Sequence, residues 1–352
     1  MKGYRRKWLF RRPVNPIKIN ADKTASTILE EMCLTAFQGR ALGEVVKTWK
    51  KMLAEKRIVI WMGLAGAMAP AGMRKIIGFL IKNRMIDVLV TTGANIYHDL
   101  YEAFGGKHYQ KTCGLKDESL KADRVNRIYD LLVDENKLYK LDSWIEKDFA
   151  GKLSDGYQYS SREIIHLLGR CVSSSNKSDG GILASAYQAG MPVFVPALPD
   201  SSIGFSLMYA NRRGGRNIVL NGLKDVEESV RITEDSSITG VVYIGGGVPK
   251  NFIQQTAVIA SYQTKHDRSH KYAVQVTMDM PFWGGLSGST LEEGKSWGKI
   301  SRSAKTATCY MDASVALPLI AHALAEENVR RRTAPRFHWK DSDLTIEFKA
   351  LT

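Results

Sequence analysis

Short apolar runs alternate with helical stretches along this chain, and this alternation restricts the fold more than any other sequence feature. The runs are RIVIWM (57–62), IDVLVTTG (86–93), PVFVPAL (192–198), NIVL (217–220), VVYIGGG (241–247) and YAVQVTM (272–278). Buried strands that alternate with helices are typical of a parallel sheet covered on both faces. The sequence therefore predicts a Rossmann-like, doubly wound α/β fold with a mainly parallel sheet and helices on both faces.

The remaining segments suggest how the chain is divided. Apolar residues recur at helical spacing over 27–53, and VALPLIAHALAEEN (315–328) is a further predicted helix. Residues 98–170 are more polar, and we expect an insertion of helices and loops there. We predict a basic N-terminal arm (1–26), a single large domain (27–328) and a basic C-terminal tail (329–352).

The net charge is +14, and much of the excess lies near the two ends of the chain. Arg11 and Arg12 lie in the predicted arm, and Arg330, Arg331 and Arg332 lie in the predicted tail. Solvated tails and contacts between subunits are the alternatives that we favour for these charges. No RNA-binding motif accompanies them, so we do not expect nucleic acid as a partner.

Other classes of protein are disfavoured by features that the sequence lacks. No apolar run reaches the roughly 18 residues of a membrane span, and the N-terminus lacks the apolar core of a secretory signal. We therefore expect a cytoplasmic protein with no membrane partner. The four cysteines have no CxxC spacing, and His266 and His270 lie in the polar segment KHDRSHK, which we interpret as a solvated turn. We therefore predict no metal site.

Glycine-rich turns follow three of the predicted strands: GLAG (63–66), TTGAN (91–95) and GGGVPK (245–250). Ligands of such folds bind beyond the carboxyl ends of the strands, where glycines let the backbone approach a phosphate. However, neither GxGxxG nor GxxxxGK[ST] is present. From the turns alone, nucleotide binding and tight packing remain equal alternatives.

Two residues that follow predicted strand ends, Asp200 and His98, are candidates for a site. Asp200, in ALPDSSIG, follows a strand end and could either cap the next helix or bind a ribose hydroxyl. His98 follows the second glycine turn. Ser201 and Ser202 lack the GxSxG context of a serine hydrolase nucleophile.

Lys299 is the main candidate for a chemical role. It follows Trp297 in GKSWGKI, and the glycine-rich loop WGGLSGST that begins at Trp283 lies just upstream. Burial would lower the pKa of a lysine and free its amine as a nucleophile, and indole rings suit a cationic amine ligand. On local grounds, a solvated surface charge is the alternative.

Together these segments resemble the deoxyhypusine synthase family, in particular its bacterial deoxyhypusine synthase-like branch. The matching motifs are GLAGAMAPAGMR (63–74), IDVLVTTGANIYHDL (86–100), PVFVPALPDSSIG (192–204), IGGGVPK (244–250), SWGKI (296–300) and YMDAS (310–314). They occur in the family's order and cover about residues 30–325.

The resemblance implies a Rossmann-like fold, bound NAD and a homotetramer with active sites between paired subunits. It also implies that an aminobutyl group moves from spermidine, or a related polyamine, through a lysine imine to an acceptor amine. The acceptor would be a lysine of the hypusine-bearing translation factor or a small amine such as putrescine, as in homospermidine synthesis. Such an enzyme is an alkyl-group transferase.

The resemblance also assigns roles to residues. Lys299 would carry the covalent imine. The residues that would bind the amine substrate are Trp297, Glu293, Gly284, Ser287, Asn251 and His98. The residues that would contact NAD are Gly66, Ala67, Thr92, Gly93, Ala94, Asp200, Asp312 and Ala313.

Three positions depart from the family pattern: Leu286 and Phe205 replace carboxylates, and Asn251 replaces a histidine. An unpaired, desolvated ammonium costs several kcal/mol, so the loss of carboxylates indicates a different amine or compensation by neighbours such as Asp279. The first hypothesis is thus an NAD-dependent aminoalkyl transferase, with a small-amine acceptor slightly favoured. The alternative is a catalytically weak NAD-binding paralogue with a scaffold or regulatory role.

Overall fold

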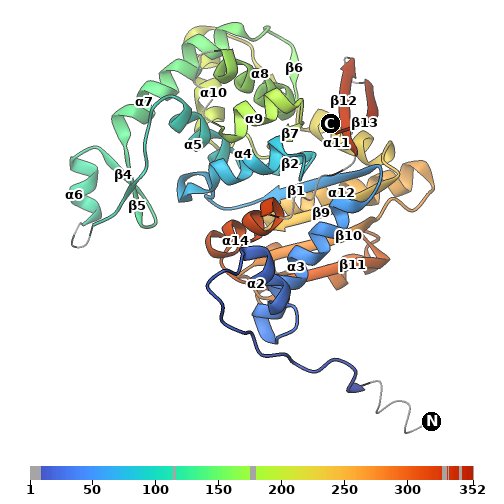
Figure 1. Cartoon of the computed structure of the whole chain (residues 1–352). Helices are drawn as coiled ribbons and strands as arrows, with labels where there is room; N and C mark the ends of the chain where they lie inside the picture. The colour runs from blue at the N-terminus through green and yellow to red at the C-terminus, as the bar shows by residue number, and fades with distance from the viewer. Residues whose placement is uncertain are drawn as a thin grey trace.

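A parallel six-stranded sheet lies at the centre of the computed structural model, which describes residues 9–112, 114, 116–174, 180–326, 331, 333–340 and 343–351 (Figure 1). The strand order is β11-β10-β9-β1-β2-β7, and every neighbouring pair is parallel. The strands are β1 (Ile58–Leu64), β2 (Val88–Thr91), β7 (Val193–Phe194), β9 (Ile238–Ile244), β10 (His270–Thr277) and β11 (Ile300–Tyr310). The predicted α/β fold with a parallel sheet is confirmed.

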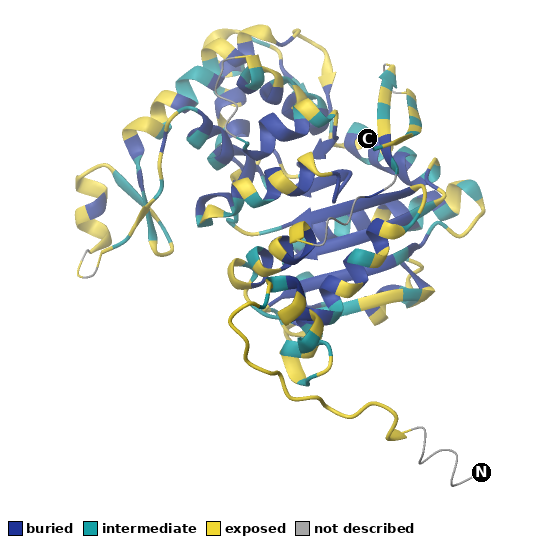
Figure 2. Ribbon diagram, in the orientation of Figure 1, coloured by how far each residue is buried: buried dark blue, intermediate teal, exposed yellow. Residues whose placement is uncertain are grey.

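The central strands are buried on both faces because alternate side chains enter two separate apolar clusters (Figure 2). In β1, Ile58, Ile60 and Met62 join the cluster that includes residues of α3 and α14, whereas Val59 and Trp61 join the cluster that includes residues of α11, α12 and α13. A strand has a side-chain period of two, so a run apolar at every position requires cover on both faces.

The helices occupy most of the segments between these strands. They are α2 (Ala25–Met32), α3 (Phe37–Ala54), α4 (Arg74–Lys82), α5 (Gly93–Ala103), α6 (Asp117–Ala122), α7 (Glu135–Trp144), α8 (Ser161–Ser174), α9 (Ile182–Ala189), α10 (Ser202–Gly214), α11 (Gly222–Glu234), α12 (Gly247–Thr264), α13 (Leu291–Ser296) and α14 (Ala313–Glu326). Short helical turns are η1 (Ala69–Met73), η2 (Ile145–Phe149), η3 (Ala150–Lys152), η4 (Pro281–Trp283) and η5 (Leu286–Gly288). Among the described residues, no helix is both long and apolar enough to cross a membrane.

One predicted strand lies outside the central sheet, and one strand of the central sheet was not predicted. The run 217–220 contributes β8 (Val219–Leu220), which pairs with β6 (Gln158–Tyr159) in a separate sheet rather than joining the central one. The edge strand β11 was not predicted, because polar residues occupy most of ISRSAKTATCY. Its pairing with β10 shifts register after Ile300, which breaks the simple alternation further.

The insertion expected over 98–170 also contains strands. β3 (Tyr109–Gln110), β4 (Val125–Ile128) and β5 (Leu131–Asp134) form a small antiparallel sheet. Together with α6, this sheet projects from the body of the molecule (Figure 1).

The segment expected as a basic tail forms an antiparallel hairpin of β12 (Thr333–Lys340) and β13 (Asp343–Ala350). Arg331, predicted to be solvated or to contact another subunit, is instead buried within its own chain. Its guanidinium donates to both oxygens of Asp87 at 2.6 and 2.7 Å and to the carbonyl of Ile58. The domain boundaries themselves remain a prediction.

His270 corrects a further expectation. It begins β10 and is fully buried, and its ring nitrogens contact Thr239 Oγ1 at 2.8 Å and the carbonyl of Ile253 at 3.4 Å. Burial lowers its pKa to about 4, so the ring is neutral at physiological pH. The histidine is therefore a core residue and not part of a solvated turn.

Candidate functional site

The carboxyl ends of the central strands form one continuous edge, which we call the carboxyl edge. The amide of Ala65, after β1, donates to the carbonyl of Ile244 at 2.9 Å, and the amide of Gly245, after β9, donates to that of Val276 at 2.8 Å. The amide of Met311, after β11, donates to the carbonyl of Thr277 at 3.2 Å, and the hydroxyl of Thr91 in β2 donates to the carbonyl of Leu64 in β1 at 2.9 Å. The three glycine-rich turns are thus neighbours at the place where such folds bind ligands.

Asn95 fixes the turns after β1 and β2 to each other. This buried side chain accepts from the amide of Ala69 at 2.9 Å and donates to the carbonyl of Gly66 at 3.0 Å and to Thr91 Oγ1 at 3.1 Å. Sequence reasoning missed Asn95, although an amide in the first turn of a helix after a glycine turn was a usable signal.

The predicted cofactor residues on these turns are held mainly through the backbone. Thr92 caps α5 by accepting from the amide of Asn95 at 3.3 Å. Gly93 packs so closely on Ser201 that an added Cβ would lie 2.4 Å from the serine Cβ. Gly66 has φ +72°, and an added Cβ would meet only Met68 Cε within 4 Å, so its outer side is open.

Asp200 does not cap the following helix, so that alternative was wrong. Ser201 caps α10 instead, accepting from the amide of Gly204 at 3.4 Å. The Asp200 side chain is exposed and has no hydrogen-bond partner among the described residues. Its carboxylate is therefore available at the carboxyl edge.

Asp312 and Ala313 lie at the far end of this edge, after β11. The Asp312 carboxylate accepts from the hydroxyl of Ser314 and from its amide, the latter at 2.7 Å, and these two bonds hold its pKa below the usual range. β10 and β9 separate β11 from β1, so these residues lie about 14 Å along the sheet from the turn after β1 at the usual strand spacing. Asp312 thus has a structural role that is independent of any ligand.

Lys299 lies in the short connection between α13 and β11. Its Nζ is 3.4 Å from Asn251 Oδ1 and 5.5 Å from the ring centre of Trp297. No ion pair among the described residues involves Lys299, so its only polar side-chain partner is a neutral amide oxygen. The Trp297 side chain is 64% exposed and so is free to contact a ligand.

The two lysines of GKSWGKI therefore differ in their surroundings. Lys295 forms an ion pair with Glu292 at 2.7 Å within α13, as expected of a peripheral charge. Thr290 caps α13 by accepting from the amide of Glu293 at 3.0 Å, which fixes the start of this short helix. The Glu293 side chain is exposed.

Lys250 is a site residue that sequence reasoning missed. It is fully buried, and its Nζ donates to Gln275 Oε1 at 3.1 Å, to Ser289 Oγ at 3.0 Å and to the carbonyls of Leu286 and Ser289. Burial lowers its pKa to about 8, with a smaller contribution from the positive charge of Lys299. The only sequence signal was its place directly after a glycine-rich turn.

Gln275 completes the attachment of the loop that follows β10. Its amide donates to the carbonyls of Gly245 at 3.0 Å and Ser287 at 2.9 Å. An added Cβ on Gly246 would lie 2.3 Å from the Ser287 Cα, so the turn after β9 and this loop are in close contact. Gly284 has φ +71° and open space around it.

His98 is occupied elsewhere in the described structure. Its Nδ1 is 3.0 Å from Nε2 of His108, and Nδ1 of His108 contacts Glu102 at 2.8 Å. Burial lowers the pKa of His98 to about 4, so its ring is neutral. These contacts do not bring His98 to Lys299.

The predicted site residues therefore form two groups. The first group lies on the carboxyl edge. The second group, the amine side, comprises Asn251, Gly284, Ser287, Glu293, Trp297 and Lys299. Lys299 directly precedes β11 whereas Asp312 directly follows it, and no hydrogen bond among the described residues joins Lys299 to the first group.

Two of the three departures from the family pattern lie together. Leu286 and Asn251 line one cavity of about 350 Å³ with Val226, Val230, Val248 and Phe252. Phe205 lies apart from them on α10, where its side chain is 53% exposed. The side of Asn251 that adjoins this cavity is thus largely apolar.

Comparisons with known proteins point to the family that the sequence motifs resemble. The deoxyhypusine synthase family model matches residues 27–324. "Probable deoxyhypusine synthase 2" of Methanosarcina mazei is 48% identical over 93% of this chain and 94% of that protein. "Deoxyhypusine synthase-like protein" of Elusimicrobium minutum is 38% identical over 87% of this chain and 82% of that protein. The archaeal relative is thus more similar than this bacterial one, although we expected the bacterial branch.

Solved structures support the same fold. A crystal structure from Entamoeba histolytica, described as a "putative deoxyhypusine synthase", has a TM-score of 0.61 at 16% identity and covers 90% of this chain and 98% of that chain. At this identity the similarity shows the fold alone. The matched family model and the extent of the archaeal relatives show that this chain belongs to the deoxyhypusine synthase family.

Proposed function

We propose that this chain is an NAD-dependent transferase that moves an aminoalkyl group from a polyamine through Lys299 to an acceptor amine. The observation that carries this proposal is the setting of Lys299, whose amine has an indole at 5.5 Å, an amide oxygen at 3.4 Å and no carboxylate partner among the described residues. An unpaired lysine beside an aromatic ring suits a nucleophile that must meet a cationic substrate.

The carboxyl edge fits NAD. Gly66 and Ala94 are exposed at turns that precede helices, and Asp200 offers a free carboxylate for ribose hydroxyls. Thr92 and Gly93 would keep these turns close together, while Asp312 and Ala313 would meet a more distant part of the cofactor. When bound, NAD would accept a hydride from the donor amine and later return it, so the transfer involves no net oxidation.

Lys299 would act on the oxidised donor. For spermidine, its amine would add to the imine carbon and displace 1,3-diaminopropane, leaving the aminobutyl chain on Lys299 as an imine. The acceptor amine would then displace Lys299, which recovers its free amine. Trp297 would lie against the cationic chain, and Lys250 would hold the loop that carries Gly284 and Ser287.

We propose further that two copies of the chain form each active site, as part of a homotetramer. Within one chain, no hydrogen bond among the described residues joins Lys299 to the residues of the first group. In the loop that follows β10, large apolar side chains are exposed: Phe282 (84%), Trp283 (74%) and Met278 (66%). Exposed apolar clusters of this kind are typical of surfaces that another protein covers. A second copy could bring its carboxyl edge to Lys299.

The acceptor amine follows from the departures on the amine side. Leu286 and Asn251 border a largely apolar cavity, which disfavours an ammonium at that position. Because the deoxyhypusine-type amine site is altered in this way, we favour a small acceptor amine slightly over a protein lysine. The same departures support the second candidate, an NAD-binding paralogue with weak catalysis and a scaffold or regulatory role. That candidate predicts NAD binding without a transfer product.

Borohydride trapping tests the main proposal. The protein would be incubated with NAD and a panel of polyamines, reduced, and analysed by mass spectrometry of peptides and of released amines. We expect an aminoalkyl adduct on Lys299 and a transfer product. The Lys299→Ala variant should give neither, whereas Lys295→Ala should retain both. An active Lys299→Ala variant would exclude the covalent mechanism, and the absence of any product would favour the paralogue.

A further inference from the structure

A second cavity lies between α8, the C-terminal end of α9, the start of β7 and the hairpin strand β12. Its volume is about 260 Å³, near the lower end of small-molecule sites. None of its lining residues is among those of the proposed active site. Two of them, Phe337 and Trp339, come from the hairpin, which lies beyond the family match at residues 27–324.

Aromatic rings form much of the wall of this cavity, which we call the aromatic pocket. Phe337 and Trp339 lie two residues apart on β12 and so share one face of the strand. His166 and Tyr187 lie on α8 and α9, with ring centres 5.0 Å apart. Ile165, Met191 and Val193 add aliphatic surface. Such a wall favours a planar, apolar ring system.

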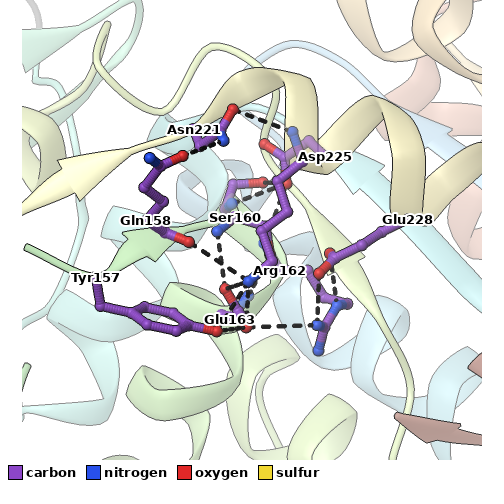
Figure 3. A network of polar contacts seen from close by, with 10 residues as sticks. Tyr157, Gln158, Ser160, Arg162, Glu163, Asn221, Asp225 and Glu228 are labelled. Atoms are coloured by element: carbon purple, nitrogen blue, oxygen red, sulfur yellow. Dashed lines mark hydrogen bonds and ion pairs between the residues drawn. The ribbon is translucent and has the colours of Figure 1, made fainter. Parts of the chain in front are cut away.

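Arg162 supplies a cation to the aromatic pocket. Its residue is 8% exposed, and its Nε and Nη2 each donate to Glu228 at 2.8 Å, which is fully buried (Figure 3). The guanidinium lies 4.0 Å from the ring centre of Trp339. Its Nη1 has no hydrogen-bond partner among the described residues, so one donor group remains available.

The surrounding charged groups keep Arg162 in place. Asp225 accepts from the amides of Ser161 and Arg162, which fixes the first turn of α8 (Figure 3). Lys224 neutralises Glu163 at 2.8 Å. Desolvation lowers the pKa of His166, and the positive charges of Arg162 and Arg170 lower it further, so this ring is neutral. Among the residues that line the pocket, Arg162 alone carries a full charge, and the carboxylate of Glu228 lies outside the lining. The charged group that the pocket offers to a ligand is therefore a cation.

We propose that the aromatic pocket binds a small planar aromatic carboxylate. The ring system would lie against Trp339, Phe337 and Tyr187, and the carboxylate would accept from Nη1 of Arg162. His166 and Gly190 are exposed at the pocket and would border the entry of the ligand. The site is independent of the proposed transferase activity, because it shares no residue with the surroundings of Lys299.

Ligand binding to the full chain tests this inference. 2-Naphthoate and its neutral analogue 2-naphthamide would be titrated by isothermal calorimetry and by saturation-transfer NMR. We expect saturable binding of the carboxylate with a dissociation constant below about 1 mM and at least about tenfold weaker binding of the amide. The Trp339→Leu variant should weaken binding of the carboxylate about tenfold, whereas Trp283→Leu, the same change in the exposed loop after β10, should leave it unchanged.

Thermal melts would establish that each variant is folded. If Trp339→Leu is not folded, Phe337→Leu and His166→Gln replace it, because these side chains are only partly buried or exposed. The proposal is overturned if 2-naphthoate shows no saturable binding, if the amide binds equally well, or if the folded pocket variants bind like the wild type. Binding that depends on Trp283 would place the ligand elsewhere and would also overturn it.

Discussion

The carboxyl edge and the amine side hold their site residues in different ways. At the carboxyl edge, glycines, a buried asparagine and bonds between strand ends fix the backbone, and few side chains need chemical properties of their own. On the amine side, Lys299, Trp297 and Asn251 would act through their side chains in the proposed reaction. Close packing restricts Gly93 and Gly246 at the carboxyl edge, whereas a substitution on the amine side changes only which group meets the ligand. This difference is consistent with a chain that departs from the family pattern at Leu286 and Asn251 while its cofactor turns match that pattern.

The largest effect is expected when the two regions are inactivated in different copies. Lys299→Ala should abolish transfer by removing the carrier amine, and Asp200→Arg should abolish it by removing the carboxylate proposed for the NAD ribose. Asp200 is exposed, so its replacement leaves the fold intact. If two copies share each site, a mixed dimer contains one intact site and one site that carries both substitutions. After subunit exchange, about half of the dimers in an equal mixture are mixed, so the mixture should recover about a quarter of the wild-type rate. Activity assays and native mass spectrometry would measure this. A mixture of exchanged subunits with no activity would show that each site lies within one chain.

The next effect concerns Lys250, which supports only the amine side. Lys250→Met removes the donor to the carbonyl of Ser289 and to Oε1 of Gln275, so the KM for the amine should rise about 10- to 100-fold while the Kd for NAD stays unchanged. Lys295→Met is the matched control, because its ion pair lies at the surface. An equal loss of NAD binding in Lys250→Met would show that the two regions are not separable.

The pH dependence of stability provides a second measurement on Lys250. Its pKa is about 8 in the folded chain against an ordinary value of 10.5, so the unfolded chain binds the extra proton between these values. The free energy of unfolding should therefore rise with pH over this window, by up to about 3 kcal/mol from this residue. Below pH 8 both states carry the proton and the penalty is fully present. Urea unfolding of wild type and Lys250→Met at pH 7.5 and 10 would compare the two slopes, and equal slopes would contradict the assignment.

A smaller effect is expected on the carboxyl edge. Asn95→Ala removes the side chain that accepts from the amide of Ala69 and donates to the carbonyl of Gly66. The loss of these bonds should cost about 1–3 kcal/mol of stability and weaken NAD binding about tenfold. Asn83→Ala is the control, since the amide of Asn83 is exposed and bonds only to the carbonyl of Phe79. Calorimetry with NAD and urea unfolding are the measurements. Unchanged NAD affinity in Asn95→Ala would mean that the turns do not depend on this bridge.

The smallest effect tests whether side chains determine the amine. Asn251→His restores the family histidine next to Lys299 and should raise kcat/KM for spermidine about tenfold. Gln255→His, one turn further along α12 in the same cavity, should have no such effect. Product analysis by mass spectrometry would follow both variants. No gain in Asn251→His would indicate that the natural amine differs from spermidine in more than this contact.

The sequence allowed the fold to be predicted where burial alone determines structure. The runs that became β1, β2, β9 and β10 are apolar because they are covered on both faces. β11 was missed because it is an edge strand with many polar side chains. The run at 217–220 has strand composition but pairs outside the central sheet, since composition does not specify a partner.

The site was only partly predictable for a similar reason. Motifs pointed to Lys299 and the glycine turns because each motif is a contiguous segment, as with Trp297 and Lys299 in SWGKI. Lys250 and Arg331 gain their meaning from partners that lie 25 to 39 and 244 residues away, respectively. Nothing in a local window distinguishes such a buried lysine or arginine from a solvated one.

The pairing of Arg331 with Asp87 also has a consequence for biosynthesis. Asp87 lies in the first quarter of the chain and Arg331 in the last tenth, so about two thirds of the chain is synthesised between this carboxylate and its counterion. Until then, burial of Asp87 would require protonation, because desolvation raises the pKa of this carboxyl. The amino ends of β1 and β2 should therefore reach their final packing only after the ribosome has released the C-terminal hairpin.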